Sequence, residues 1–146
     1  MKKKRYVAKA LVLSIFISVF SILTVLAAYE KYTTTINMAS GTTLYGAERN
    51  MPYKNHRITI TPTELRFSTT DNIVTLNIDL QHKALFGWES MGNTDRQFTE
   101  VGQTKGVLWT NKKSGKTRYV FNTGDYGNRT GAIKADPVYI WNLDQV

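Results

Sequence analysis

The stretch NIVTLNIDL, residues 72–80, carries the clearest structural signal in the chain. From position 74 to position 80 every even-numbered residue is a branched aliphatic one, and the odd-numbered residues between them are polar. Because successive side chains of a β-strand point to opposite faces, this alternation predicts a strand with one buried and one wet face. Such half-buried strands are typical of antiparallel sheets.

The composition of this strand continues on both sides of it. After Tyr29 the chain is rich in Thr, Val, Ile, Tyr, Phe and Trp, and no segment has the periodicity of an amphipathic helix. We therefore expect an all-β fold, a small antiparallel β-sandwich or small barrel of about eight or nine strands. The other expected strands include YTTTIN (32–37), HRITITP (56–62), ELRFS (64–68), RQFTEV (96–101), GVLWTN (106–111), KTRYVFN (116–122) and PVYIWNL (137–143).

Turn residues predict how the middle strands are connected. QHK (81–83) is expected to end the first strand, and ALFGWES (84–90) to run back along it. A short helix over 79–88 is the alternative, but Gly87 inside it would cost about 1 kcal/mol relative to Ala. MGNTD (91–95) predicts another turn.

Two further expectations concern the last third of the chain. GVLWTN and KTRYVFN predict a hairpin around a four-residue loop, 112–115, in which Gly115 takes a positive φ. The closing segment, 137–143, has apolar residues at both odd and even positions, which favours a strand buried on both faces.

The first 28 residues form a separate unit. Five basic residues lie within positions 1–9, and Ala10 to Ala28 is an uncharged, mostly apolar run of 19 residues that ends in small residues. This order predicts a secretory signal peptide, with an uncleaved membrane-anchoring helix as the alternative. In both cases the segment inserts in a membrane at least during export, and residues 29–146 form one domain outside the cytoplasm.

Removing the leader changes the meaning of the charge. The whole chain has a net charge of +8, but from Tyr29 onward there are 14 basic and 11 acidic residues, or +3. This modest charge does not indicate a nucleic-acid partner. Residues 29–102 carry −1 and residues 103–146 carry +4, so the final third is expected to be attracted to an anionic wall polymer or membrane surface.

The sequence contains no cysteine, so the domain must be held together by burial without disulfides. Its 118 residues after Ala28 suffice for one core. Cysteine-free export behind a long basic leader is typical of Gram-positive bacteria, by association.

No catalytic or metal-binding pattern in the sequence is complete. The loop of FNTGDYGNRTGAIKADPVYIW (121–141) has glycines at 124, 127 and 131, but it lacks the Lys-Ser/Thr pair of a phosphate-binding loop and the acidic series of a calcium loop. No serine lies in a G-x-S-x-G elbow, and His56 and His82 are too far apart for a short-spaced zinc motif. We expect no enzyme, no cofactor and no metal, although a pair of carboxylates brought together by folding would permit a cell-wall hydrolase.

The remaining candidates are contact residues. Basic side chains in the final third, together with one tyrosine in the glycine-rich loop, are expected to touch the envelope: Lys112, Lys113, Lys116, Arg118, Tyr126, Arg129 and Lys134. The leading hypothesis is an exported, non-enzymatic β-domain that binds an anionic cell-envelope component through these loops. A secreted bacteriocin-like antibacterial protein is the second hypothesis. The sequence does not determine the oligomeric state.

Overall fold

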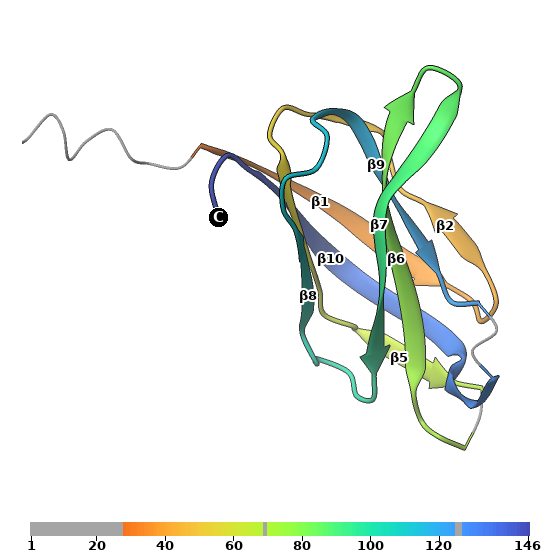
Figure 1. The fold of residues 1–146 in the computed structure, drawn as a ribbon. Helices are drawn as coiled ribbons and strands as arrows, with labels where there is room; N and C mark the ends of the chain where they lie inside the picture. The colour runs from red at the N-terminus through yellow and green to blue at the C-terminus, as the bar shows by residue number, and fades with distance from the viewer. Residues whose placement is uncertain (1–27, 69, 125–126) are drawn as a thin grey trace, which may run out of the picture.

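The computed structural model describes residues 28–68, 70–124 and 127–146, and within these ranges the protein is a β-sandwich (Figure 1). Two five-stranded antiparallel sheets pack face to face, which confirms the predicted fold class. The ten strands slightly exceed the expected eight or nine. The predicted signal or anchor helix, 1–28, lies outside the described residues except for Ala28.

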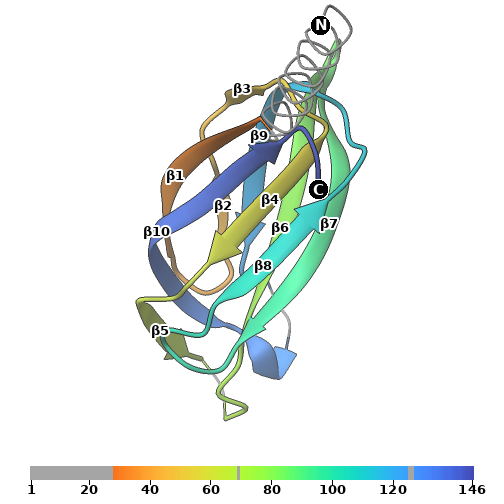
Figure 2. The same cartoon turned by 90° about the vertical axis from the view of Figure 1, so that its left-hand side faces the viewer.

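The first sheet, sheet A, has the strand order β1-β10-β4-β8, and β5 pairs with the other part of β10. Its strands are β1 (Tyr29–Met38), β4 (Asn55–Ile60), β5 (Glu64–Phe67), β8 (Lys105–Trp109) and β10 (Gly131–Leu143). The long β10 lies between β1 and β4, so the C-terminal strand is the centre of this sheet (Figure 2).

The second sheet, sheet B, has the order β2-β9-β6-β7, and β3 also pairs with β9. Its strands are β2 (Thr43–Tyr45), β3 (Arg49–Met51), β6 (Val74–Ala84), β7 (Gly87–Phe98) and β9 (Gly115–Asn122). A short 3-10 helix, η1 (Gly127–Arg129), precedes β10.

The core lies between the two sheets, and β6 supplies its centre. Val74, Leu76, Ile78 and Leu80 are each fully buried, as their alternation predicted. The rest of the hydrophobic cluster comes from both sheets and consists of Ile36, Met38, Met51, Ile58, Ile60, Phe98, Val107, Trp109, Tyr119, Phe121, Ile133, Ala135, Val138 and Ile140. The opposite face of β6 is less exposed to solvent than expected, because Thr75 is also buried.

The predicted connections around β6 and β7 need correction. QHK (81–83) does not end the strand, because β6 continues to Ala84 and only Leu85 and Phe86 separate it from β7. Gly87 has φ 137°, a conformation that glycine adopts most easily, and it lets the chain reverse within two residues. The alternative helix over 79–88 is therefore excluded.

MGNTD (91–95) is not a turn but part of β7. Leu80 pairs with Gly92 and Gln81 with Ser90, so one extra residue bulges out of β7 at this point. Gly92 has φ 145° and faces the Trp109 ring, where a Cβ would lie 3.2 Å from two ring atoms. A glycine inside a strand thus marks a bulge and a close approach here.

The predicted hairpin between 106–111 and 116–122 is wrong. β8 pairs with β4 in sheet A, whereas β9 pairs with β6 in sheet B, so the loop between them crosses from one sheet to the other. Gly115 does have the predicted positive φ, 112°. The crossing is fixed by backbone contacts, since Lys112 N donates to Lys54 O at 2.8 Å.

The closing strand is buried mainly on one face. Val138 and Ile140 are in the core, but Tyr139 and Trp141 are only partly covered on the outer face of sheet A. Lys31 Nζ lies 4.3 Å from the centre of the Tyr139 ring, and the Arg57 guanidinium lies 5.4 Å from that of Trp141. The expected burial on both sides is thus replaced by cations that cover the outward rings.

Candidate functional site

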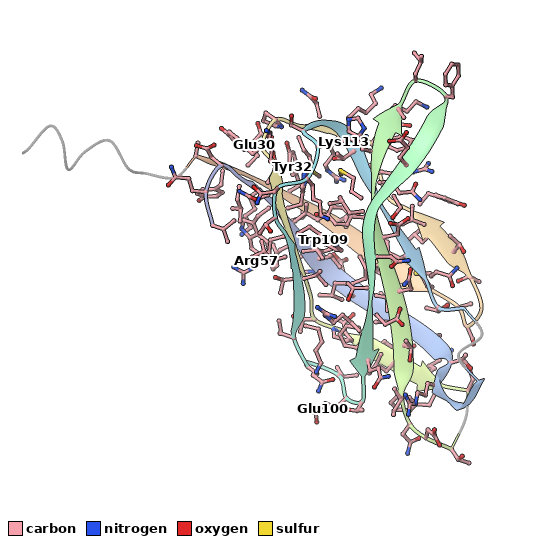
Figure 3. All side chains as sticks on the ribbon, in the orientation of Figure 1. Glu30, Tyr32, Arg57, Glu100, Trp109 and Lys113 are labelled. Carbon is pink, nitrogen blue, oxygen red and sulfur yellow. The ribbon has the colours of Figure 1, made fainter. Side chains whose placement is uncertain are left out.

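One end of the sandwich, here called the tip end, gathers the features that are most suited to binding. It contains the start of β1, the β6–β7 turn and the β8–β9 loop, which lie at the same end in both ribbon views (Figures 1 and 2). The strand register agrees, because Tyr29 pairs with Leu143 and Leu143 with Asn55. Figure 3 shows Lys113 at this end and Glu100 at the opposite end.

The β6–β7 hairpin projects beyond the sandwich at the tip end. The pairing of β6 with β9 stops at His82 and Thr117, whereas β6 and β7 continue to pair through Lys83–Trp88 and Ala84–Gly87. Residues 83–88 are therefore a two-stranded arm. Its turn carries Leu85 and Phe86, whose exposed fractions are 88% and 96%.

The base of the arm is held by stacked aromatic and cationic side chains. The Arg118 guanidinium lies 4.2 Å from the centre of the Trp88 ring and 4.8 Å from that of Tyr45, and its Nε donates to Gln81 Oε1 at 2.9 Å. Lys83 Nζ lies 5.1 Å from the Trp88 ring. These contacts keep two positive charges beside the arm and fix the position of the ring.

The β8–β9 loop adds further lysines at the foot of the arm. Lys113 Nζ forms an ion pair with Glu89 Oε2 at 2.8 Å, and this contact lowers the pKa of the exposed Glu89 carboxyl. Lys116 Nζ lies 3.4 Å from Glu48 Oε2. Both pairs are solvent-exposed, so they contribute little to stability and leave the lysines accessible.

The backbone of this loop is anchored to the core through His56. The ring is fully buried, and its Nε2 lies 3.3 Å from Lys113 O, to which it donates. Its Nδ1 faces the amide nitrogen of Asn142 at 3.4 Å and the sulfur of Met51 at 3.3 Å. Burial lowers the pKa of His56, so the ring is neutral and structural.

The predicted contact residues separate into two groups. Lys112, Lys113, Lys116 and Arg118 lie together at the tip end, on the β8–β9 loop and the start of β9. Arg129 in η1 and Lys134 in β10 lie toward the opposite end, beside β5. Tyr126 lies outside the described residues.

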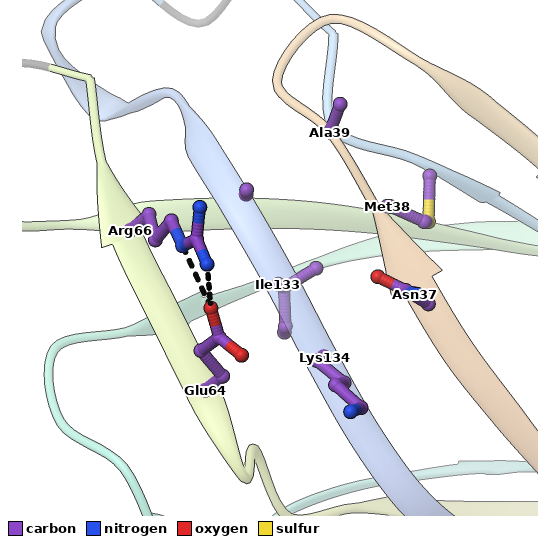
Figure 4. Close-up of a pocket in the computed structure, with 8 residues that line it drawn as sticks. Asn37, Met38, Ala39, Glu64, Arg66, Ile133 and Lys134 are labelled. Atoms are coloured by element: carbon purple, nitrogen blue, oxygen red, sulfur yellow. Dashed lines mark hydrogen bonds and ion pairs between the residues drawn. The ribbon is translucent and has the colours of Figure 1, made fainter.

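The surroundings of Lys134 differ from the tip end. Lys134 lines an open depression of about 350 Å³ together with Asn37, Glu64 and Arg66 (Figure 4). Arg66 Nη2 lies 2.6 Å from Glu64 Oε1, so charges of both signs already meet there. The charged residues that line this depression sum to +1, which is less than the +4 of segments 83–89 and 112–118 at the tip end.

The arm itself was missed by the sequence interpretation, which placed residues 84–90 in a returning strand. Leu85 and Phe86 are apolar, and apolar residues normally predict burial rather than a turn. The useful signal was Gly87, because a glycine directly after two residues that follow a long strand permits a tight reversal.

Two features are absent from the described residues. Within 28–68, 70–124 and 127–146 no helix has the length and hydropathy needed to cross a membrane. In the same residues no three acidic or imidazole side chains come together in a way that suits a metal ion.

No protein-family model matches the sequence, and the comparison with curated proteins finds no match. The comparison with solved structures gives distant matches, among them the following three. Disulfide-linked pili of Bacillus endospore appendages share 8% identity over 82% of this chain and 91% of that chain, with a TM-score of 0.41. PliG of Aeromonas hydrophila, a periplasmic inhibitor of g-type lysozyme, shares 11% over 81% and 88%, with a TM-score of 0.39. A CBM4 structure shares 12% over 77% and 57%, with a TM-score of 0.33. These likenesses are too distant to carry a functional argument.

Proposed function

We propose that this protein is an exported, non-enzymatic β-sandwich that binds an anionic component of the cell envelope through its tip end. The observation that carries the proposal is the gathering of basic side chains around the arm. Two segments far apart in the sequence, 83–89 and 112–118, contribute five basic residues and one acidic residue there.

The charge of the domain is concentrated at this place. Residues 29–146 have a net charge of +3. These two segments carry +4, or +3 together with Glu48, which pairs with Lys116, so the rest of the domain is neutral overall. A local excess of one sign attracts the opposite sign at short range and is screened by salt. Binding through the tip end is therefore expected to weaken steeply as the salt concentration rises.

The absence of catalysis is part of the proposal. His56 is buried against backbone and amide groups, and His82 lies within β6, where its cross-strand partner is Thr117 of β9. Purified protein incubated with isolated cell walls should release no sugar or peptide fragments. Release of such fragments would refute the non-enzymatic assignment.

Binding itself is tested with a soluble polyanion. The full chain, held in a non-ionic detergent, is titrated with poly(glycerol phosphate) at low and high salt, with neutral dextran as the control polymer. We expect salt-sensitive binding to the polyanion alone. The double variant K112Q/K116Q should bind more weakly, whereas R129Q/K134Q, which removes two basic residues away from the tip end, should bind like the wild type.

Two results would overturn the assignment of the tip end. One is an equal loss of affinity in both double variants, which would indicate a response to overall charge. The other is binding that does not change with salt, which would indicate recognition without the basic residues.

A further inference from the structure

The arm presents two large apolar side chains to water without any cover. Leu85 and Phe86 are adjacent and are almost fully exposed, although the other large side chains of β6 and β7 pack in the core or along the arm. Apolar side chains at the end of a projecting element are unfavourably exposed to water. Their transfer into an apolar medium lowers the free energy of the system.

We propose that Leu85 and Phe86 enter the hydrocarbon boundary of an anionic lipid bilayer while the basic side chains around the arm bind its headgroups. This inference rests on the proposed function and names its target. The bilayer is chosen because one end of the molecule joins an apolar tip to a positive collar, and a lipid surface presents an apolar layer beneath negative charge.

The arm is built so that its end can leave water. Its backbone groups pair across the hairpin at Lys83–Trp88 and Ala84–Gly87, and only two residues form the turn. Few unpaired peptide groups would therefore enter the apolar layer, which is the main obstacle for an irregular loop. No core residue has to move for the tip to insert.

The spacing along the arm matches the layers of a bilayer. Trp88 and Lys83 lie about two residues behind the turn, or roughly 7 Å at the rise of a strand. An interfacial element buries its apolar face by about 5–10 Å. Trp88 would then lie at headgroup depth, where tryptophan is favoured, and the Lys83 side chain would reach the phosphates.

The collar supplies the second attraction that a small apolar tip needs. Two inserted side chains give only marginal membrane binding, and adjacent basic residues make it stable. Arg118 lies on β9 beside Trp88 of the arm, and Lys113 pairs with Glu89 at its foot, so both charges come close to the headgroups once the tip is inserted. Strand β1 also begins at this end, at Tyr29, directly after the apolar run 10–28 of the sequence.

The test uses the full chain reconstituted into vesicles, so that any insertion of residues 1–28 is common to all samples. Because the protein has no cysteine, L85C gives a single site for an environment-sensitive fluorophore. V101C, which replaces a residue that is 56% exposed and lies beyond β7 at the other end, is the matched control. Vesicles of phosphatidylcholine are compared with vesicles that also contain phosphatidylglycerol, with and without bromine-labelled acyl chains.

We expect the label at position 85 to shift to the blue and to be quenched by the brominated chains in anionic vesicles, while the label at position 101 stays in water. Adding F86S to L85C should lower the ratio of inserted to free tips by about 10- to 150-fold. Binding of poly(glycerol phosphate) should not change with F86S.

Each other outcome has a definite meaning. If the protein shows no salt-sensitive binding to the polyanion or to anionic vesicles, and the label at position 85 gives no response to either, the proposed function fails. If the polyanion binds but the label at position 85 stays in water, the function stands and the bilayer inference is wrong. If F86S abolishes self-association in sedimentation and leaves the vesicle signal unchanged, the tip binds a second copy, and the inference is again wrong.

Discussion

His56 Nε2 lies 3.3 Å from Lys113 O, so a fully buried ring on β4 holds the backbone of the most basic loop in the domain. The contact joins the two sheets, because the loop leads from β8 in sheet A to β9 in sheet B. Asn142 supports the arrangement from β10, where its amide nitrogen donates to Tyr53 O at 2.8 Å. The lysines of the tip end are thus displayed from a backbone that is tied to the core.

The first prediction concerns acid. Burial lowers the pKa of His56 below its ordinary 6.5. Above that pH the ring is neutral in both the folded and the unfolded chain, so its full stabilising contribution is present. As the pH falls below 6.5, the unfolded chain binds a proton that the folded chain does not yet bind, so the stabilising contribution decreases progressively. The decrease is complete once the pH is below the folded-state pKa.

His56→Gln keeps a donor for Lys113 O and removes the titrating ring. Between about pH 7.5 and about pH 5, the free energy of unfolding of the variant should decline less steeply than that of the wild type, by at most about 1.4 kcal/mol per pH unit. Denaturant titrations at several pH values measure the two slopes. Parallel slopes would show that His56 does not contribute to the acid sensitivity.

The second prediction concerns Gly131, at the start of β10. A Cβ at this position would lie 2.7 Å from Val74 Cγ2 and would also meet Arg66 O. Gly131→Ala should therefore force β5 away from β10 and lower the free energy of unfolding by about 1–3 kcal/mol. Gly106→Ala in β8 is the control, since its nearest neighbour, Ile58 O, is at an ordinary 3.5 Å. Thermal unfolding of both variants measures the difference, and equal effects would contradict it.

The third prediction compares two isoleucines of the stretch that predicted the fold. Ile78 is fully buried in the centre of the core, whereas Ile73 precedes β6 and is only partly covered. Ile78→Ala should lower the free energy of unfolding by about 2–5 kcal/mol, and Ile73→Ala by clearly less. Similar losses in a denaturant titration would mean that the alternation does not define the core.

The fold class could be predicted from the sequence because the alternation of apolar and polar residues along β6 is a local property of the chain. The alternation of Leu76 and Ile78 with polar neighbours specifies a strand and its buried face without knowledge of its partners. The pairing of strands depends on distant segments. β8 and β9 look like a hairpin because they are adjacent in the sequence, yet each pairs with a strand of a different sheet.

The candidate site, too, has some features that the local sequence predicts and others that depend on how distant segments meet. The charge of residues 112–118 is visible in the sequence, and the structure places these residues at one end. Their neighbours at Leu85 and Phe86 were not predictable, because two apolar residues in a turn resemble two residues of a buried strand. Gly131 stands out in the sequence only as the last of three glycines in a loop, whereas in the structure the lack of space beside Arg66 and Val74 requires a glycine there.

The last prediction separates the charge of Arg118 from its shape. The guanidinium stacks between Trp88 and Tyr45, at 4.2 Å and 4.8 Å from the ring centres, and donates to Gln81. Arg118→Lys keeps the positive charge but loses the planar group, so it should lower the free energy of unfolding by about 1 kcal/mol and leave polyanion affinity nearly unchanged.

Arg118→Met completes the comparison because it removes the charge and retains a long side chain. It should lower both the stability and the affinity for poly(glycerol phosphate), and it should reduce the salt dependence of binding. Denaturant titration and polyanion titration of the two variants measure the two effects separately. If Arg118→Lys weakens polyanion binding as much as Arg118→Met does, then the stacked geometry at the base of the arm, and not the net charge of the tip end, governs recognition.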